Sequence, residues 1–258
     1  MSKGEKTYEL ALFAGAGGGI LGGMLCGHTV VGVVEIEEYP RDVLKQRQRD
    51  GILDRFPIWD DVTTFRVDNP ECREYIEGLR GVKQSLVISA GWPCQDLSIA
   101  NPNGKGLDGE RSGLWSEVER IISEIRPKNV FLENSAMLAV RGGTRVIEDL
   151  AGMGYVGSWG AMGGIEAGLS ADGKRIWILA HEAYSERRIA AEIQGAISYS
   201  EKPWRRQFER AISACASESE HAELLRDTNV LAGRMGAIKA AGNGQMARLV
   251  KLAWEILG

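Results

Sequence analysis

The stretch TYELALFAGAGGGILGGML, residues 7–25, decides the fold of this chain. Its first part, residues 7–13, has the apolar character of a buried strand, and the glycine run after it predicts a tight turn into a helix. In the order strand, glycine loop and helix, the N–H groups at the start of the helix face a nucleotide-like ligand. Gly17, Gly19 and Gly22 fit the spacing G-x-G-x-x-G, but in a chain with 33 glycines a turn without any ligand is the alternative.

Two more strand signals follow, and each ends in acidic residues. Residues 29–34 predict a second strand that leads into Glu35, and an acid about 20 residues beyond such a glycine loop accepts hydrogen bonds from ribose hydroxyls. A short strand within residues 56–62 carries Asp60 and Asp61 near its end. We expect one of these aspartates to reach the base of a bound adenosine. The alternative is that they cap the following helix.

The chain next predicts a cysteine in a turn after a fully buried strand. Residues 86–88 are apolar, and Gly91 and Pro93 then stop the strand just before Cys94. Open α/β sheets carry their chemistry in such turns at the carboxyl ends of strands. A cysteine there acts as a nucleophile when its surroundings favour the thiolate, whereas a buried structural cysteine is the alternative.

A second reactive group is expected one strand further along. Residues 101–113 are polar and rich in glycine, which predicts a loop that closes over a substrate. Residues 129–132 then predict a buried strand that leads into Glu133 and Asn134. A carboxylate at an apolar strand end is costly unless it is used or paired, and burial would raise its pKa toward that of a proton donor. The alternative role for Glu133 is a cap of the next segment.

The remaining patterns complete an α/β chain. Arg175 begins a clear apolar strand, and residues 202–210 mix basic with aromatic side chains, which suits phosphate contacts and base stacking, or else a solvated helix face. The other expected elements are helices at 40–50, 114–125, 146–153 and 246–257 and strands at 155–162 and 175–180.

Composition narrows the class of protein. The chain has 258 residues and a net charge of −4, so it does not coat nucleic acid by charge alone. Its four cysteines and three histidines are scattered, which predicts neither a disulfide framework nor a metal site. No apolar run reaches the roughly 20 residues of a membrane span, and no signal peptide is evident, so we expect a cytoplasmic protein.

Taken together, these motifs resemble those of the cytosine-C5 DNA methyltransferases, particularly the short phage-type members. The matches follow the family order: the loop at 13–18, Glu35, Asp61, the Pro-Cys motif at 91–95, Glu133-Asn134 and Gly242-Asn243. The resemblance implies a Rossmann-like S-adenosylmethionine-dependent methyltransferase fold with a mostly parallel central sheet and a small target-recognition region. It also implies double-stranded DNA as the partner, a monomer, a bacterial or phage-infected host cell, and no metal.

The resemblance assigns the chemistry to particular residues. Cys94, after Pro93, would add to C6 of a flipped cytosine, and Glu133 would hold or donate a proton at N3. Asn134 would fix the loop and Arg175 would bind the base carbonyl, while C5 takes the methyl group of S-adenosylmethionine and leaves S-adenosylhomocysteine. The expected cofactor residues are Phe13, Ala14, Gly15, Gly17, Gly18, Glu35, Ile36, Asp61, Val62, Asn243 and Gly244. The expected DNA-binding residues are Gln95, Ser98, Lys105, Arg111, Arg205 and Arg206.

The domain expectation is a cofactor-binding and catalytic domain at 1–182, a target-recognition region at 183–233 and a returning segment at 234–258. The sequence departs from the family at residues 171–175, ADGKR, where only Arg175 remains of an arginine-rich motif. This departure makes a catalytically impaired cofactor- or DNA-binding homologue one alternative. An RNA cytosine-5 methyltransferase, with the same chemistry on another substrate, is a second. A nicotinamide dehydrogenase would explain the glycine loop but not the cysteine and glutamate motifs. The sequence neither predicts nor excludes a partner restriction nuclease.

Overall fold

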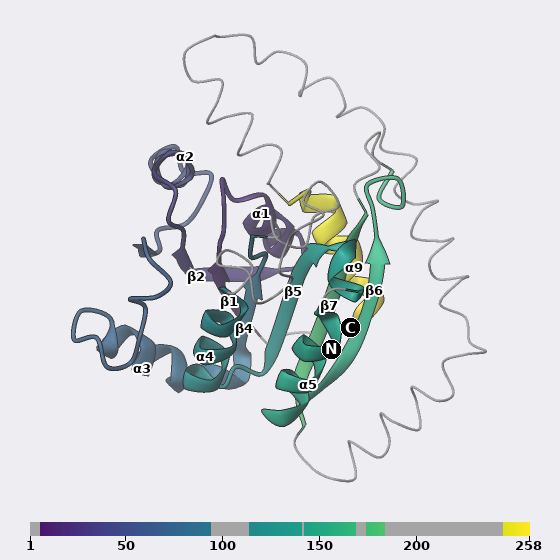
Figure 1. Cartoon of the computed structure of the whole chain (residues 1–258). Helices are drawn as coiled ribbons and strands as arrows, with labels where there is room; N and C mark the ends of the chain where they lie inside the picture. The colour runs from purple at the N-terminus through teal and green to yellow at the C-terminus, as the bar shows by residue number, and fades with distance from the viewer. Residues whose placement is uncertain (1–5, 94–113, 141, 169–173, 184–244) are drawn as a thin grey trace.

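The computed structural model describes residues 6–93, 114–140, 142–168, 174–183 and 245–258 (Figure 1). These residues form a sheet whose strand order is β3-β2-β1-β4-β5-β7-β6. The strands are β1 (Thr7–Leu12), β2 (His28–Val34), β3 (Ile58–Trp59), β4 (Leu86–Ala90), β5 (Asn129–Ser135), β6 (Tyr155–Met162) and β7 (Arg175–Glu182). The first five strands are parallel, and β7 pairs antiparallel with both β5 and β6. The expected mostly parallel, Rossmann-like α/β sheet is confirmed.

Helices cover both faces of the sheet because alternate side chains of each strand point to opposite faces. Leu10, Leu12 and Ile88 belong to a core cluster shared with α3, α4 and α5, whereas Ala11 and Val87 belong to clusters shared with α1, α2 and α9. Figure 1 shows α4 and α5 on one side of the sheet and α1 and α9 on the other. The helices are α1 (Gly18–Leu25), α2 (Glu38–Arg49), α3 (Arg73–Gly81), α4 (Trp115–Ile125), α5 (Gly143–Gly152) and α9 (Ala247–Leu257), with short 3-10 turns at η1 (Lys83–Ser85) and η4 (Ala136–Ala139).

The carboxyl-terminal helix α9 packs against α1 and the sheet. Its buried side chains are Leu249, Val250, Leu252, Ala253 and Trp254. Burial of each larger apolar side chain stabilises the fold by about 1.5–3 kcal/mol. Helix α1, near the start of the described residues, and helix α9, at their end, therefore pack together.

Two features of the fold differ from the sequence expectation. Helix α3 was not predicted, because its buried stripe consists of only Ile76 and Leu79 among polar neighbours. Strand β5 does not stop before Glu133: it runs on to Ser135, because β7 pairs with Glu133 through Trp177. The glutamate therefore stands on a rigid strand and not in a loop. In the described residues, no helix has the length and apolar character needed to cross a membrane.

Candidate active site

The glycine loop leaves β1 through an unusual backbone conformation. Phe13 has a φ of 54°, in the left-handed region that costs a non-glycine residue about 1–3 kcal/mol. Gly15 and Gly17 also have positive φ angles, of 53° and 90°, and Gly17 is the N-cap of α1. The backbone thus turns within a few residues from the end of β1 into the first turn of α1. The N–H groups of such a first turn lack partners within the helix and suit a ligand.

Glu35 joins this loop to the end of β2. Its side chain is buried, and its Oε2 accepts a 2.7 Å hydrogen bond from the N–H of Gly15. Its Oε1 accepts a second bond of 2.8 Å from the N–H of Glu37. Each carboxylate oxygen has two acceptor sites, so both oxygens keep capacity for a hydroxyl. Beside it, Ile36 is 63% exposed and offers an apolar surface.

Asp61 begins a segment that α4 holds in place. Its Oδ1 accepts hydrogen bonds from the N–H and the hydroxyl of Thr63, at 2.9 and 2.8 Å. The next residue, Val62, is buried, and its carbonyl accepts a 3.0 Å bond from Nη2 of Arg120 in α4. Nη1 of Arg120 donates to the carbonyl of Phe65 at 3.1 Å.

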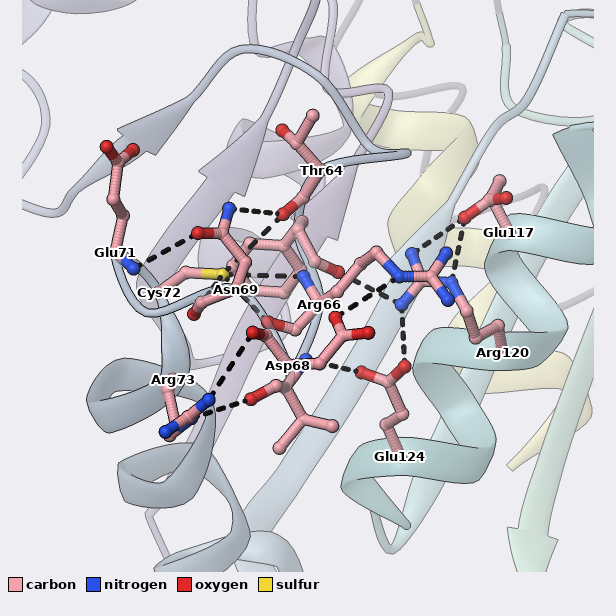
Figure 2. A network of polar contacts seen from close by, with 12 residues as sticks. Thr64, Arg66, Asp68, Asn69, Glu71, Cys72, Arg73, Glu117, Arg120 and Glu124 are labelled. Carbon is pink, nitrogen blue, oxygen red and sulfur yellow. Dashed lines mark hydrogen bonds and ion pairs between the residues drawn. The ribbon is translucent and has the colours of Figure 1, made fainter.

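Arg120 is itself fixed by two acids of its own helix. Glu117 and Glu124 flank the guanidinium at 2.7 and 2.8 Å, one turn before and one turn after it (Figure 2). Glu124 also accepts a hydrogen bond from the N–H of Val67. The position of the segment that begins at Asp61 is therefore set by side chains of α4.

The turn after β4 is held by β5. Trp92 is buried against Trp115 of α4, with 5.2 Å between ring centroids. Its carbonyl accepts a 3.2 Å hydrogen bond from Nδ2 of Asn134. Pro93 follows, half-buried, and is the last described residue before Cys94. Asn134 thus fixes the backbone from which the chain departs toward Cys94.

Glu133 stands beside Asn134 with a partner at each carboxyl oxygen. Its Oε1 lies 3.4 Å from Nε of Arg175, at the start of β7. Its Oε2 accepts a 3.2 Å hydrogen bond from Nε2 of Gln245, which precedes α9. Burial raises the pKa of Glu133 above its ordinary value, although Arg175 and then Gln245 act in the opposite direction. A buried carboxyl with a raised pKa suits a proton donor.

A buried polar cluster lies below this site. Glu9 of β1 is 2% exposed, and its two oxygens contact Nδ1 of His28 at 3.0 Å and the hydroxyl of Ser89 at 2.6 Å. These three residues line one small cavity together with Glu133 and Gln245. The cluster therefore links β1, β2 and β4 through side-chain contacts next to Glu133 and Gln245. In the described residues no group of three or more His, Cys, Asp or Glu side chains is placed to hold a metal ion.

Comparisons with known proteins show the family of this chain. The family model described as C-5 cytosine-specific DNA methylase matches residues 9–230. The chain belongs to the C-5 cytosine-specific DNA methylase family. Two relatives of this chain are type II methyltransferases: M.CviJI of Paramecium bursaria Chlorella virus IL3A, 36% identical over 58% of this chain and 36% of its own length, and M.NgoMIV of Neisseria gonorrhoeae, 30% identical over 63% and 47%.

Solved structures show the same fold. A DNA modification methyltransferase encoded within an E. coli prophage gives a TM-score of 0.52 at 20% identity, over 69% of this chain and 47% of that one. A DNMT2 variant from Spodoptera frugiperda gives 0.54 at 16% identity, over 70% and 51%. The chain spans between about a third and a half of the length of the two curated relatives.

The structure brings together only part of the predicted site. Glu133, Asn134 and Arg175 lie on adjacent strands beside the turn at Pro93, and the predicted cofactor residues from Phe13 to Gly18 lie next to Glu35. Asp61 and Val62 are placed by α4. Other predicted site residues lie outside the described part of the chain: Cys94, Gln95, Ser98, Lys105, Arg111, Arg205, Arg206, Asn243 and Gly244.

Sequence reasoning missed two groups of this site. Gln245 was passed over although it directly follows the predicted Asn243 and Gly244. Glu9 was treated as part of an apolar strand, although an acid in the middle of such a strand signals a buried partner.

Proposed function

We propose that this protein is a DNA (cytosine-5-)-methyltransferase that forms a covalent intermediate through Cys94. The observation that carries the proposal is the buried Glu133 carboxyl, held between Arg175 and Gln245 on the strand beside the turn that leads to Cys94. Membership of the C-5 cytosine-specific DNA methylase family supports both the reaction and double-stranded DNA as substrate. The similarity to type II methyltransferases supports a role in a restriction–modification setting.

The described cysteines favour Cys94 as the nucleophile. Burial, with the nearby acids Glu255 and Glu9, raises the pKa of Cys26 to about 12, so that its thiolate is scarce at neutral pH. Cys72 is buried and its thiol donates to the carbonyl of Arg66 at 3.1 Å. Cys94 follows a turn at the carboxyl end of a parallel strand, where such sheets place reacting groups.

The residues near the glycine loop fit S-adenosylmethionine. The left-handed turn at Phe13 and Gly15 leads into the first turn of α1, Glu35 retains acceptor capacity for ribose hydroxyls, and Asp61 lies at the next strand end. When bound, this cofactor supplies an electrophilic methyl group on a sulfonium.

The protein's own groups then carry the reaction on cytosine. The Cys94 thiolate forms a bond to C6 of an everted cytosine while Glu133 donates a proton to N3, so no negative charge accumulates on the ring. C5 of the resulting enamine would take the methyl group that the cofactor supplies, with S-adenosylhomocysteine as the leaving group, while N3 returns its proton to Glu133. Loss of the C5 proton to a base returns the electron pair that expels Cys94 and restores the aromatic ring. Arg175, which pairs with Glu133, would bind the base carbonyl in this arrangement.

The test uses duplex DNA that contains 5-fluorocytosine, since fluorine cannot leave as a proton and the Cys94 adduct persists. With S-adenosylmethionine present, we expect a denaturation-resistant protein–DNA band for the wild-type protein and none for Cys94→Ser. A tRNA containing 5-fluorocytosine serves as the second substrate and should give no band. A folded, cofactor-binding wild-type protein that forms no adduct with DNA would contradict the proposal, and an adduct with tRNA alone would favour the RNA enzyme.

A further inference from the structure

Gln245 has no role among the predicted site residues, yet its side chain touches two reactive parts of the site. Its Nε2 lies 3.2 Å from Oε2 of Glu133, a residue 112 positions earlier in the chain. Its own backbone and side-chain oxygens lie against Gly18 and Gly19, in the first turn of α1. The same residue therefore contacts the carboxyl on β5 and the start of the helix that follows the glycine loop.

Glycines from two separate loops make room for this side chain. A Cβ on Gly18 would lie 1.9 Å from the carbonyl oxygen of Gln245, and one on Gly19 would lie 2.2 Å from its Oε1. A Cβ on Gly91, after β4, would lie 2.7 Å from Nε2 of Gln245 and 2.9 Å from Oε2 of Glu133. Any other residue at these positions would displace Gln245 or the carboxyl, so the space is shaped around this contact.

The backbone of Gln245 is held by the helix that follows it. Helix α9 lies along α1 in Figure 1. Val250 packs so closely on Gly22 that a Cβ added to Gly22 would lie 2.3 Å from the Cβ of Val250. The ring of Trp254 meets His28 edge to face at a centroid distance of 4.5 Å. Gln245 therefore lies just before the start of α9, a helix held in place by its packing on α1 and His28.

An amide suits this position for a chemical reason. A proton donor must exist both with and without its proton, and the positive charge of Arg175 favours the ionised form of Glu133. The neutral Gln245 amide donates to the Glu133 carboxylate, and this hydrogen bond stabilises the ionised form without adding a second positive charge.

We propose that Gln245 is a positioning residue that holds the Glu133 carboxyl against the first turn of α1 and thereby joins the proton donor to the loop expected to bind the cofactor. This inference rests on the proposed function only for the role of Glu133 as the donor. The contact itself is independent of the substrate.

The experiment compares the full-length wild-type protein with Gln245→Met, which keeps the length of the side chain and removes its hydrogen-bonding groups. The matched control is Gln46→Met on the exposed face of α2, where Gln46 bonds only to its neighbour Asp50. Titration of Glu133 is followed by NMR of protein labelled with ¹³C at the glutamate carboxyl, with the resonance assigned through Glu133→Gln. Single-turnover methyl transfer to DNA is measured over the same pH range.

We expect the titration midpoint of Glu133 to rise by about one pH unit in Gln245→Met, because a hydrogen bond to its charged form is lost. The alkaline limb of methyl transfer should move upward by the same amount, and the rate at its maximum should fall about tenfold. Gln46→Met should match the wild type in both measurements. A purely structural role for Gln245 would lower the rate without moving either midpoint.

An unchanged Glu133 midpoint in a folded Gln245→Met protein would overturn the inference. A shifted midpoint in a protein whose wild type transfers no methyl group would instead contradict the proposed function and leave the Gln245 contact established. Gln245→Glu gives a second variant: a carboxylate beside Glu133 should raise its midpoint further than Gln245→Met does, and a midpoint at or below the wild-type value would also overturn the inference.

Discussion

At the scale of single residues, the site depends on a carboxyl that is costly to bury. The Glu133 side chain is only 12% exposed, and its neighbours Arg175 and Gln245 offset only part of the desolvation. Its pKa is raised, so the ionised form destabilises the folded state above that pKa, and the cost disappears as the pH falls below the ordinary glutamate pKa. A residue kept under such a penalty is a candidate for function.

Glu133→Gln should separate the role of this carboxyl in the reaction from its destabilising effect on the fold. We expect methyl transfer to fall by about 10²–10⁴-fold, because the amide cannot donate the N3 proton as a general acid does. The thermal midpoint should rise at neutral pH, since the buried charge is removed, and the gain should vanish in acid. Wild-type transfer should decline as the pH rises through the raised pKa of Glu133, while the residual rate of the variant should show no such decline.

The measurements are single-turnover transfer of labelled methyl groups, thermal unfolding across pH, and calorimetry with S-adenosylmethionine. Affinity for the cofactor should stay near the wild-type value. Full activity in Glu133→Gln would remove this carboxyl from the reaction.

Residue-scale prediction from sequence succeeded where the signal was local. Glu133 and Asn134 directly follow an apolar run, and Glu35 directly follows a strand. Gln245 and Glu9 were missed because their partners are distant: Glu133 lies 112 positions from Gln245, and Ser89 lies 80 positions from Glu9. Only the packed sheet brings such pairs together.

At the scale of elements, α4 supports two parts of the site at once. Trp115, in its first turn, packs on Trp92 before the Cys94 turn, and Arg120 binds the carbonyls of Val62 and Phe65 after Asp61. Figure 2 shows this guanidinium between Glu117 and Glu124, facing the backbone of the segment that begins at Asp61. The helix that follows the predicted substrate loop at 101–113 therefore also sets the predicted adenine end of the cofactor site.

Arg120→Met should weaken this support. Two backbone carbonyls lose their donor, so we expect the free energy of unfolding to fall by about 1–3 kcal/mol and cofactor affinity to drop severalfold. Urea unfolding and calorimetry with S-adenosylmethionine measure the two effects. Lys45→Met, which removes an exposed ion pair with Asp42, is the control and should change neither value appreciably. Unaltered cofactor affinity in a destabilised Arg120→Met protein would confine Arg120 to a structural role.

Element prediction was accurate where apolar periodicity was strong and failed where it was weak. The strand at 175–180 and the helix at 114–125 have broad apolar faces and were placed within two residues of the observed ends. Helix α3 buries only Ile76 and Leu79, too few for a helical pattern to stand out. The extension of β5 through Glu133 comes from pairing with β7, which is a tertiary effect.

At the scale of the whole molecule, the sheet order places the reacting groups together. β1 and β4 are neighbours, and β5 lies next to β4, so the glycine loop and the Cys94 turn follow two adjacent strands and Glu133 lies on the third. The order of motifs along the sequence was enough to predict this class of sheet. It was not enough to predict that α9 returns to close the site through Gln245, because that contact depends on how α9 packs on α1.

The size and net charge of the chain limit how the protein could bind DNA. The chain carries a net charge of −4 and spans about a third to a half of the length of its curated relatives. Recognition of a duplex would therefore rest on a local surface and not on overall charge. Under the proposed function, the protein should still mark a recurring sequence context.

The most direct measurement is base-resolution sequencing of cytosine methylation in DNA from cells that express the wild-type protein or Cys94→Ser. The account predicts 5-methylcytosine at one recurring sequence context in the wild-type cells and its absence in the Cys94→Ser cells. Unmethylated DNA in cells that contain the folded wild-type protein, or equal methylation in both strains, would contradict it.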